Sequence, residues 1–234
     1  MEKTLTVIIP FYNEKNFIEA SVNRVINENI SNEIILVDDC SDDGTEQVAK
    51  RLENNFENIT YIKTDKNEGK GSALARAQSM VSSSHVIVHD ADLEYFPSDI
   101  REMFELADLK EDKLILGSRT IGSKERTNLY KFTFYGNKLL TKLFSMLNNY
   151  KISDIATCYQ LMYASFFKNL DIKEKGFGIE VEILSKFIKT KGNITEYPIN
   201  YEARSYEDGK KIKLKDGIKI FLKIFKYRIS TKKF

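Results

Sequence analysis

Short apolar runs alternate with helix-like stretches along the first half of the chain. The runs, which predict strands, lie at 4–10, 33–37, 59–63, 85–89 and 113–117. The stretches between them, which predict helices, lie at 14–27, 43–54, 69–81 and 97–107. Because the runs are continuous rather than alternating in polarity, both faces of the sheet should be covered. The pattern therefore predicts an α/β fold with a mostly parallel sheet and helices on both faces.

Polar or charged residues follow each predicted strand at its carboxyl end, where such sheets bind ligands. In chain order these segments read PFYNE, DDCSDDGT, TDKNEGKGSA, DADLEY and GSR. Chance would distribute such residues over both ends of the sheet, so we expect a ligand site at this edge. In the second segment, Asp38 and Asp39 would be available to the ligand as hydrogen-bond acceptors. Asp42 and Asp43 would instead start the next helix, where negative charge suits the helix dipole.

The segment DADLEY places Asp90 and Asp92 on either side of Ala91, directly after a buried strand. Two carboxylates this close repel each other unless a cation lies between them, and hard divalent ions prefer oxygen ligands. Mg²⁺ or Mn²⁺ bridging a diphosphate would fit, with Glu94 as a third ligand. The alternative is a solvated turn that caps the helix beginning at Pro97.

The segment EGKGSA, at 68–73, begins a predicted helix with two glycines and Lys70. Backbone N–H groups and the helix dipole at such a position favour an anion. The segment is neither a P-loop nor a complete G-x-G-x-x-G motif. The alternative is a tight strand-to-helix turn with a solvated lysine.

Composition indicates an ordinary globular protein. The chain has 234 residues, 42% of them hydrophobic and 30% charged, which fits one domain with or without a small appendage. No apolar run reaches the roughly 18 residues of a membrane-spanning helix, and the first residues lack the pattern of a signal peptide. With only two cysteines, Cys40 and Cys158, we expect a reducing, cytoplasmic setting.

Positive charge collects towards the end of the sequence. Residues 202–234 carry eleven Lys/Arg and four Asp/Glu, a net +7, which leaves −5 for the rest of a chain whose total is +2. Apolar residues at helical spacing predict amphipathic helices over 129–148 and 214–229. A basic amphipathic helix fits an anionic membrane surface. The alternative for both helices is packing against the domain or a second subunit, and no nucleic-acid partner is expected.

The ordered set of motifs resembles a known family. IIPFYNE, VDDCSDDGT, NEGKGSA and HDADLEY look like the nucleotide-diphospho-sugar glycosyltransferases of family 2, which have the Rossmann-like GT-A fold. GSR, DIATCYQLM, GFGIEVEI and YEARSYEDGKKI resemble the dolichyl-phosphate mannose/glucose synthase-like branch. The resemblance implies a GT-A domain over 1–212, with a nucleotide-sugar half (1–118) and an acceptor-side half (119–212). A basic amphipathic tail follows at 213–234.

The resemblance also implies roles for the residues at matching positions. The donor would be bound by Pro10, Tyr12, Glu14, Asp38, Asp39, Lys70, Gly71, Asp90 and Ala91. The metal, Mg²⁺ or Mn²⁺, would be held by Asp90, Asp92 and Glu94. The acceptor phosphate would meet Arg119 and, by a looser match, Arg126. The catalytic residues would be Asp92, Asp154, Arg204 and Lys211.

The chemistry of the implied reaction is consistent with these roles. Arg204 and Lys211 would neutralise the diphosphate as it leaves. Asp154 is a candidate on the acceptor side, either as a base or as an orienting group, and its alternative is a helix cap or turn. Glu180, at the start of a predicted helix, is a further residue to follow.

The sequence thus predicts an inverting glycosyltransferase that moves a sugar from a UDP- or GDP-sugar to a polyprenyl phosphate. It would act at the cytoplasmic face of a membrane, held there by the tail or by a membrane partner protein. One alternative is transfer to a hydroxyl of a growing glycan, which needs a base. A sugar-1-phosphate nucleotidyltransferase would need a glycine-rich loop where this chain has PFYNEKN. A non-catalytic binding module is the last alternative.

Overall fold

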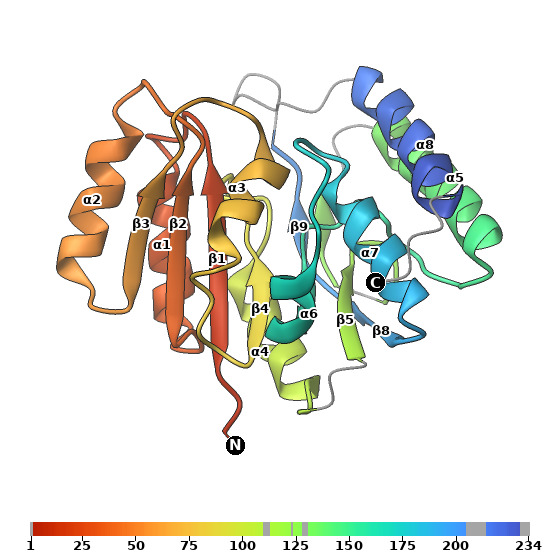
Figure 1. Ribbon diagram of the computed structural model, residues 1–234, viewed down its shortest axis with the longest axis horizontal. Coiled ribbons are helices and arrows are strands. Elements are labelled where there is room, and N and C mark those ends of the chain that lie inside the picture. The colour runs from red at the N-terminus through yellow and green to blue at the C-terminus, as the bar shows by residue number, and fades with distance from the viewer. Residues whose placement is uncertain (1, 110–112, 123, 128–130, 205–213, 230–234) are drawn as a thin grey trace.

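A seven-stranded sheet forms the centre of the molecule (Figure 1). The computed structural model describes residues 2–109, 113–122, 124–127, 131–204 and 214–229. The strand order is β3-β2-β1-β4-β7-β5-β8, and β7 is antiparallel to both of its neighbours while the other pairs are parallel. The strands are β1 (Leu5–Phe11), β2 (Glu33–Asp38), β3 (Ile59–Lys63), β4 (His85–Val88), β5 (Lys113–Ser118), β7 (Gln160–Tyr163) and β8 (Asn193–Pro198). The mostly parallel sheet that the apolar runs predicted is confirmed.

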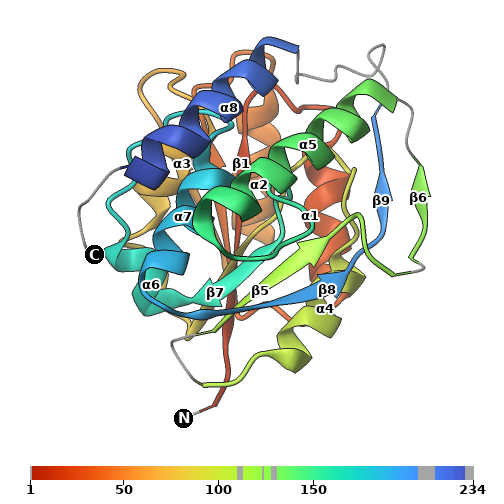
Figure 2. The same ribbon diagram turned by 90° about the vertical axis from the view of Figure 1, so that its right-hand side faces the viewer.

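Helices cover both faces of this sheet. They are α1 (Ile18–Asn27), α2 (Thr45–Asn55), α3 (Lys70–Ala77), α4 (Pro97–Leu106), α5 (Lys131–Asn148), α6 (Ala164–Asn169), α7 (Ile179–Lys189) and α8 (Leu214–Ile229). Helices α1, α2 and α4 lie on one face, and α3, α6 and α7 lie on the other (Figures 1 and 2). All seven residues of β1 are buried, as expected for a central strand covered on both sides.

Two of the predicted helix starts are too early. Helix α1 begins at Ile18 rather than at Glu14, because the carbonyl of Glu14 closes a turn with the N–H groups of residues 17 and 18. Helix α2 begins at Thr45 rather than at Asp43. The Asp43 carboxylate accepts hydrogen bonds from Thr45, and Gly44 takes a left-handed conformation (φ 95°) that an L side chain rarely adopts. The predicted helix at 69–81 ends at Ala77.

The second half of the chain adds a small two-stranded sheet and a helical layer. Strands β6 (Arg126–Thr127) and β9 (Tyr201–Glu202) pair in parallel beside the main sheet. The amphipathic stretches predicted at 129–148 and 214–229 form α5 and α8, which lie side by side with α8 also against α7 (Figure 2). None of the described helices is long and apolar enough to cross a membrane.

Candidate active site

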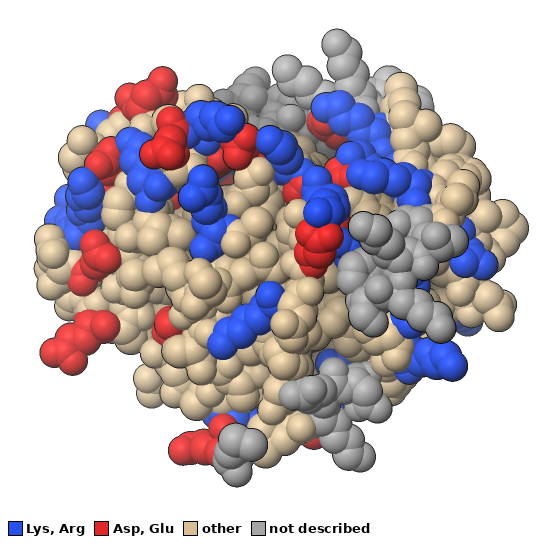
Figure 3. Space-filling model, viewed as in Figure 1, with Lys and Arg blue, Asp and Glu red and all other residues tan. Residues whose placement is uncertain are grey.

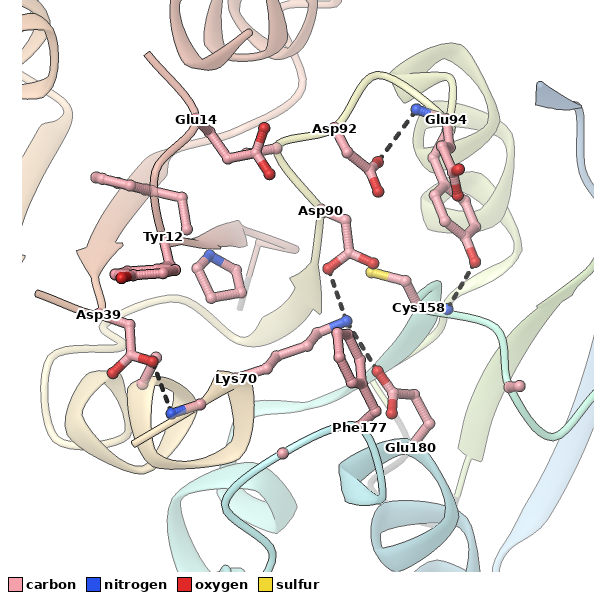
Figure 4. A pocket seen from close by; sticks show the side chains of 18 of the residues that line it. Tyr12, Glu14, Asp39, Lys70, Asp90, Asp92, Glu94, Cys158, Phe177 and Glu180 are labelled. Atoms are coloured by element: carbon pink, nitrogen blue, oxygen red, sulfur yellow. Dashed lines mark hydrogen bonds and ion pairs between the residues drawn. The ribbon is translucent and has the colours of Figure 1, made fainter. Parts of the chain in front are cut away.

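A cavity of about 300 Å³ opens at the carboxyl ends of β1, β2 and β4 (Figure 4). Most of the site residues predicted from the sequence line it, namely Pro10, Tyr12, Glu14, Asp39, Lys70, Asp90, Ala91, Asp92, Glu94, Arg119 and Arg204. Asp38, Gly71 and Asp154 do not line it. Lys211 and the side chain of Arg126 lie outside the described part of the chain. The structure therefore brings together residues that are almost two hundred positions apart.

The two aspartates that end β2 have different surroundings. Asp38 is fully buried, and its carboxylate accepts hydrogen bonds from the Ser41 N–H at 2.7 Å and the Tyr61 hydroxyl at 3.0 Å. Asp39 lies on the cavity wall and accepts from the N–H groups of Glu68 at 3.0 Å and Gly69 at 2.6 Å. The sequence assigned the nucleoside base to Asp38. The Asp38 side chain is fully buried and does not line the cavity, whereas Asp39 does, although both carboxylates accept hydrogen bonds within the protein.

Lys70 extends from the first residue of α3 across the floor of the cavity (Figure 4). Its Nζ lies 2.6 Å from Asp90 Oδ1 and 2.8 Å from Glu180 Oε1. Burial alone would lower the pKa of Lys70, but the charges of Asp90 and Glu180 raise it well above its usual value. For Asp90 the directions are reversed: burial alone would raise its pKa, but the Lys70 ammonium lowers it. The solvated lysine considered from the sequence is therefore wrong.

Gly71 has a packing role. Its N–H donates to the Lys175 carbonyl at 2.8 Å, and a Cβ at this position would lie 1.8 Å from the Glu174 carbonyl oxygen. The close approach brings the segment after α6 against the start of α3. This segment carries Gly176 and Phe177 to the cavity wall. Gly71 was predicted at the nucleotide, and instead it allows the wall to form.

Asp92 lies beside Asp90 without a cation of its own among the described residues (Figure 4). Burial, together with repulsion by Asp90 and Glu94, raises the pKa of Asp92 to about 8. Glu94, predicted as a third metal ligand, accepts hydrogen bonds from the Tyr201 hydroxyl at 2.5 Å and the Arg204 N–H at 2.7 Å. No group of three acidic, histidine or cysteine side chains in the described residues is arranged to hold a metal ion. The residues present fit a cation, since Asp92 is a half-buried carboxylate whose neighbours Asp90 and Glu94 are also acidic and for which the described residues provide no ion-pair partner.

Arg204 lies on the cavity wall against the segment between β1 and α1. Its Nη2 lies 3.0 Å from Glu14 Oε2, and its guanidinium carbon lies 4.0 Å from the centre of the Phe17 ring. The Nε of Arg204 is buried and has no hydrogen-bond partner in the described residues. The residue predicted at the ribose and the residue predicted at the diphosphate therefore pair with each other, and one guanidinium N–H remains to be satisfied.

Arg119 and Asp154 form a bidentate ion pair, with Arg119 Nε 2.8 Å from Oδ2 and Nη2 2.9 Å from Oδ1. Asp154 is fully buried. Burial would raise its pKa, but the charge of Arg119 lowers it. Of the two roles left open by the sequence, this geometry favours orientation of Arg119 over action as a base. The Arg119 guanidinium faces the cavity and lies 4.9 Å over the ring of Tyr201.

The structure adds cavity residues to which the motifs assigned no role. They include Tyr95, Cys158, Phe177, Tyr201, Asp216 and Ile220. The last two belong to α8, so the predicted tail contributes to the cavity wall. Tyr95 accepts a hydrogen bond from the Cys158 N–H at 3.1 Å, which fixes the segment after Asp154 against the segment after β4. No residue pattern signalled these contacts, because they join segments far apart in the sequence.

Sequence relatives of this chain act on dolichyl phosphates. A UDP-N-acetylglucosamine–dolichyl-phosphate N-acetylglucosaminyltransferase from Methanococcus voltae is 28% identical over 241 residues, covering 95% of each chain. A dolichol-phosphate mannosyltransferase from Pyrococcus furiosus is 27% identical over 210 residues, covering 88% of this chain and 58% of that protein. The resemblance to the dolichyl-phosphate sugar synthase branch is confirmed by these relatives.

Solved structures share the fold. Glucosyl-3-phosphoglycerate synthase from Mycobacterium tuberculosis, solved with Mn²⁺, UDP and glucosyl-3-phosphoglycerate, matches with a TM-score of 0.74 at 16% identity, covering 96% of this chain and 80% of that one. A mannosyltransferase from Pyrobaculum calidifontis, solved with GDP-Man and Mn²⁺, matches with a TM-score of 0.62 at 18% identity, covering 88% and 59%. The GT-A fold expected from the motifs is confirmed.

The family assignment follows from the sequence itself. The family described as Glycosyl transferase family 2 matches residues 6–171, which is more than half of the chain and includes the segments after β1, β2, β3 and β4. This protein therefore belongs to glycosyl transferase family 2.

Proposed function

We propose that the protein is an inverting glycosyltransferase that moves a sugar from a UDP- or GDP-sugar to a polyprenyl phosphate at a membrane surface. The observation that carries the proposal is that one cavity joins an acidic pair, Asp90 and Asp92, to an arginine whose counter-ion is buried behind it, Arg119. The acidic pair suits the donor diphosphate and its metal. The arginine suits an acceptor that is already an anion.

On the donor side, different residues would contact the base, the ribose and the diphosphate. Asp39 and Tyr12 lie on the wall near β1 and β2, where the nucleoside would bind. Arg204 would exchange its contact with Glu14 for one with the diphosphate, and Glu14 would accept from the ribose. Its unsatisfied Nε supports this exchange, since an anion would satisfy it. Lys211, from the same segment, is proposed to add a second positive charge.

Asp90 and Asp92 are the residues that would hold Mg²⁺ or Mn²⁺. When bound, the ion supplies positive charge to the diphosphate as negative charge grows on it. Lys70 forms an ion pair with Asp90, which holds Asp90 in place, and a second ion pair with Glu180. Glu94 would act indirectly, by fixing the backbone of Arg204. Metal dependence is supported by the surroundings of Asp92, where two other carboxylates lie nearby and no cationic side chain of the described residues pairs with it.

The acceptor side favours a phosphate over a hydroxyl. A hydroxyl acceptor needs a general base, whereas a lipid phosphate is ionised near neutral pH. Asp154 is occupied by Arg119, which makes it a weak base. The alternative acceptor, a glycan hydroxyl, would have to use Glu180 as its base, a carboxylate on the cavity wall that pairs with Lys70 at 2.8 Å.

Apolar side chains on the outer faces of α5 and α8 support contact with a membrane. The most exposed are Tyr135, Leu139, Met146, Ile218, Phe221, Leu222 and Ile229. Basic side chains lie on and around α8 along the upper part of Figure 3, and Lys219 is 70% exposed. Part of the tail charge is used internally, because Lys223 and Lys226 pair with Glu174. The proposed location is the cytoplasmic face of an anionic membrane, with or without a membrane partner protein.

The direct test is transfer of labelled sugar from a panel of UDP- and GDP-sugars to polyprenyl phosphate in vesicles. We expect label in the lipid extract, with loss of at least about a hundredfold in Asp92→Asn. Glu57→Gln, which removes an exposed carboxylate between α2 and β3 at the opposite edge of the sheet, should keep full activity. Label that reaches glycan and not lipid would overturn the acceptor assignment. In that case Glu180→Gln should abolish transfer to the glycan.

A further inference from the structure

Asn137 connects helix α5 to the buried carboxylate behind Arg119. Its Nδ2 donates to Asp154 Oδ1 at 2.8 Å. The same oxygen accepts Arg119 Nη2 at 2.9 Å, and the other oxygen accepts Arg119 Nε at 2.8 Å. Asn137 and Arg119 therefore approach one carboxylate from different elements, and the asparagine limits how that carboxylate can rotate.

The orientation of the Asn137 amide is determined by its partner. Turning the amide over would place its oxygen against the Asp154 carboxylate. In the observed orientation Asn137 Oδ1 is buried and has no hydrogen-bond partner within the described residues. An unpaired buried amide oxygen is costly, and an apolar side chain of the same shape would avoid that cost. An apolar replacement of Asn137 would therefore lose the hydrogen bond that its Nδ2 donates to Asp154.

Helix α5 also carries part of the exposed apolar surface. Tyr135 and Leu139, two residues on either side of Asn137, are 64% and 70% exposed. One helix thus presents apolar side chains to the outside and a single amide donor to Asp154. The position of α5 and the position of the Arg119 guanidinium are linked through this contact.

We propose that Asn137 is a positioning residue for the acceptor phosphate, which holds Asp154 in the orientation that aims Arg119 into the cavity. The inference rests on the assignment of the acceptor phosphate to Arg119 in the proposed function. Asn137 does not touch the cavity itself. Its loss should weaken binding of the acceptor phosphate and leave binding of the nucleotide unchanged.

The chain offers a matched control for this residue. Asn148 is a half-buried asparagine on the same helix, and its Nδ2 donates at 2.9 Å to the Phe144 carbonyl within α5. Asn137→Leu and Asn148→Leu therefore remove the same group from one helix. Asn137→Gln keeps an amide donor and should restore part of the lost function.

The first measurement is the Nε–H resonance of Arg119 in NMR spectra of the whole protein, assigned by its disappearance in Arg119→Lys. We expect a slowly exchanging signal in the unmodified protein and in Asn148→Leu. We expect the signal to shift and to exchange with water faster in Asn137→Leu. An unchanged signal in folded Asn137→Leu would overturn the positioning role, and this outcome does not depend on any substrate.

The second measurement is the affinity for farnesyl phosphate, a short polyprenyl phosphate, and separately for UDP and GDP. We expect Asn137→Leu to weaken farnesyl phosphate about tenfold, with nucleotide affinity unchanged. Equal weakening of both ligands, or of neither, would contradict the inference. If the unmodified protein binds no farnesyl phosphate while the NMR result holds, the lipid-phosphate assignment fails and the positioning of Arg119 by Asn137 stands.

Discussion

Tyr227 on α8 donates a hydrogen bond to Glu174 Oε1 at 2.6 Å, which joins the end of the described chain to the segment that carries Gly176 and Phe177 to the cavity wall. Lys226 donates to the same oxygen at 2.8 Å, and Lys223 donates to the other. The neighbouring Lys175 carbonyl accepts from the first turn of α3. Helix α8 is thus connected through one buried carboxylate to the helix that carries Lys70.

Replacing Glu174 should loosen α8. Glu174→Gln leaves three donors with a weaker acceptor, so we expect the free energy of unfolding to fall by about 1–3 kcal/mol. Hydrogen exchange should rise in α8 and at the start of α3. The measurement is urea unfolding with exchange mass spectrometry. Glu202→Gln, at an exposed residue, is the control, and equal exchange in both variants would contradict the link.

Glu174 should also make stability depend on pH. Burial by itself would raise its pKa, but hydrogen bonds from Lys223, Lys226 and Tyr227 lower it from 4.5. A carboxyl group whose pKa is lower in the folded state stabilises the fold above its unfolded pKa, and this contribution disappears as the pH falls through the folded value. Below about pH 4.5, unfolding free energy should therefore fall more steeply in the unmodified protein than in Glu174→Gln. Parallel curves in urea titrations across this range would refute the assignment.

Gly71→Ala should disrupt the cavity wall. The added Cβ would lie 1.8 Å from the backbone oxygen of Glu174, which cannot move without shifting its segment. We expect a loss of about 1–3 kcal/mol of stability by urea unfolding, together with weaker nucleotide binding. Gly136→Ala on α5 meets open space and should instead stabilise by about 0.5–1 kcal/mol. A neutral Gly71→Ala would show that the segment after α6 is free to move.

Asp92→Asn should separate stability from activity. Asp92 is half-buried beside Asp90 and Glu94, and its pKa is raised to about 8, so a carboxylate at this position opposes folding when no metal is present. In a chelator we expect the variant to be more stable by about 1 kcal/mol, measured by thermal unfolding. Its transfer activity with metal restored should be lost. A variant that is less stable than the unmodified protein in chelator would argue against an unfavourable carboxylate at position 92.

Removal of divalent ions should stop transfer without unfolding the protein. The described fold is held by a large apolar core, and the acidic pair lies at the rim of the sheet rather than within that core. We expect chelation to abolish transfer and leave circular dichroism unchanged. Mn²⁺ or Mg²⁺ should restore activity and Ca²⁺ should restore less, because larger ions accept more ligands at longer distances. Full turnover in chelator would contradict a metal-dependent mechanism.

The strands and the edge at which the site forms could be predicted from the sequence. Continuous apolar runs at Glu33–Asp38 and His85–Val88 can be buried only within a covered sheet, and parallel strands bring their carboxyl ends to one edge. The position of the acidic pair follows from this geometry alone. Helix starts were less certain, because the side chain of Asp43 and the conformation of Gly44 delay α2.

The partner of each charged side chain was decided only by the tertiary structure. Asp38 and Asp39 are adjacent in the sequence, yet alternation along a strand turns one to Tyr61 inside and the other to the cavity. Asp154 was a possible base until the fold placed Arg119 against it. The tail was a separate basic segment until Glu174 accepted its lysines. Sequence patterns record local periodicity, whereas the pairing of buried charges depends on which distant segments pack together.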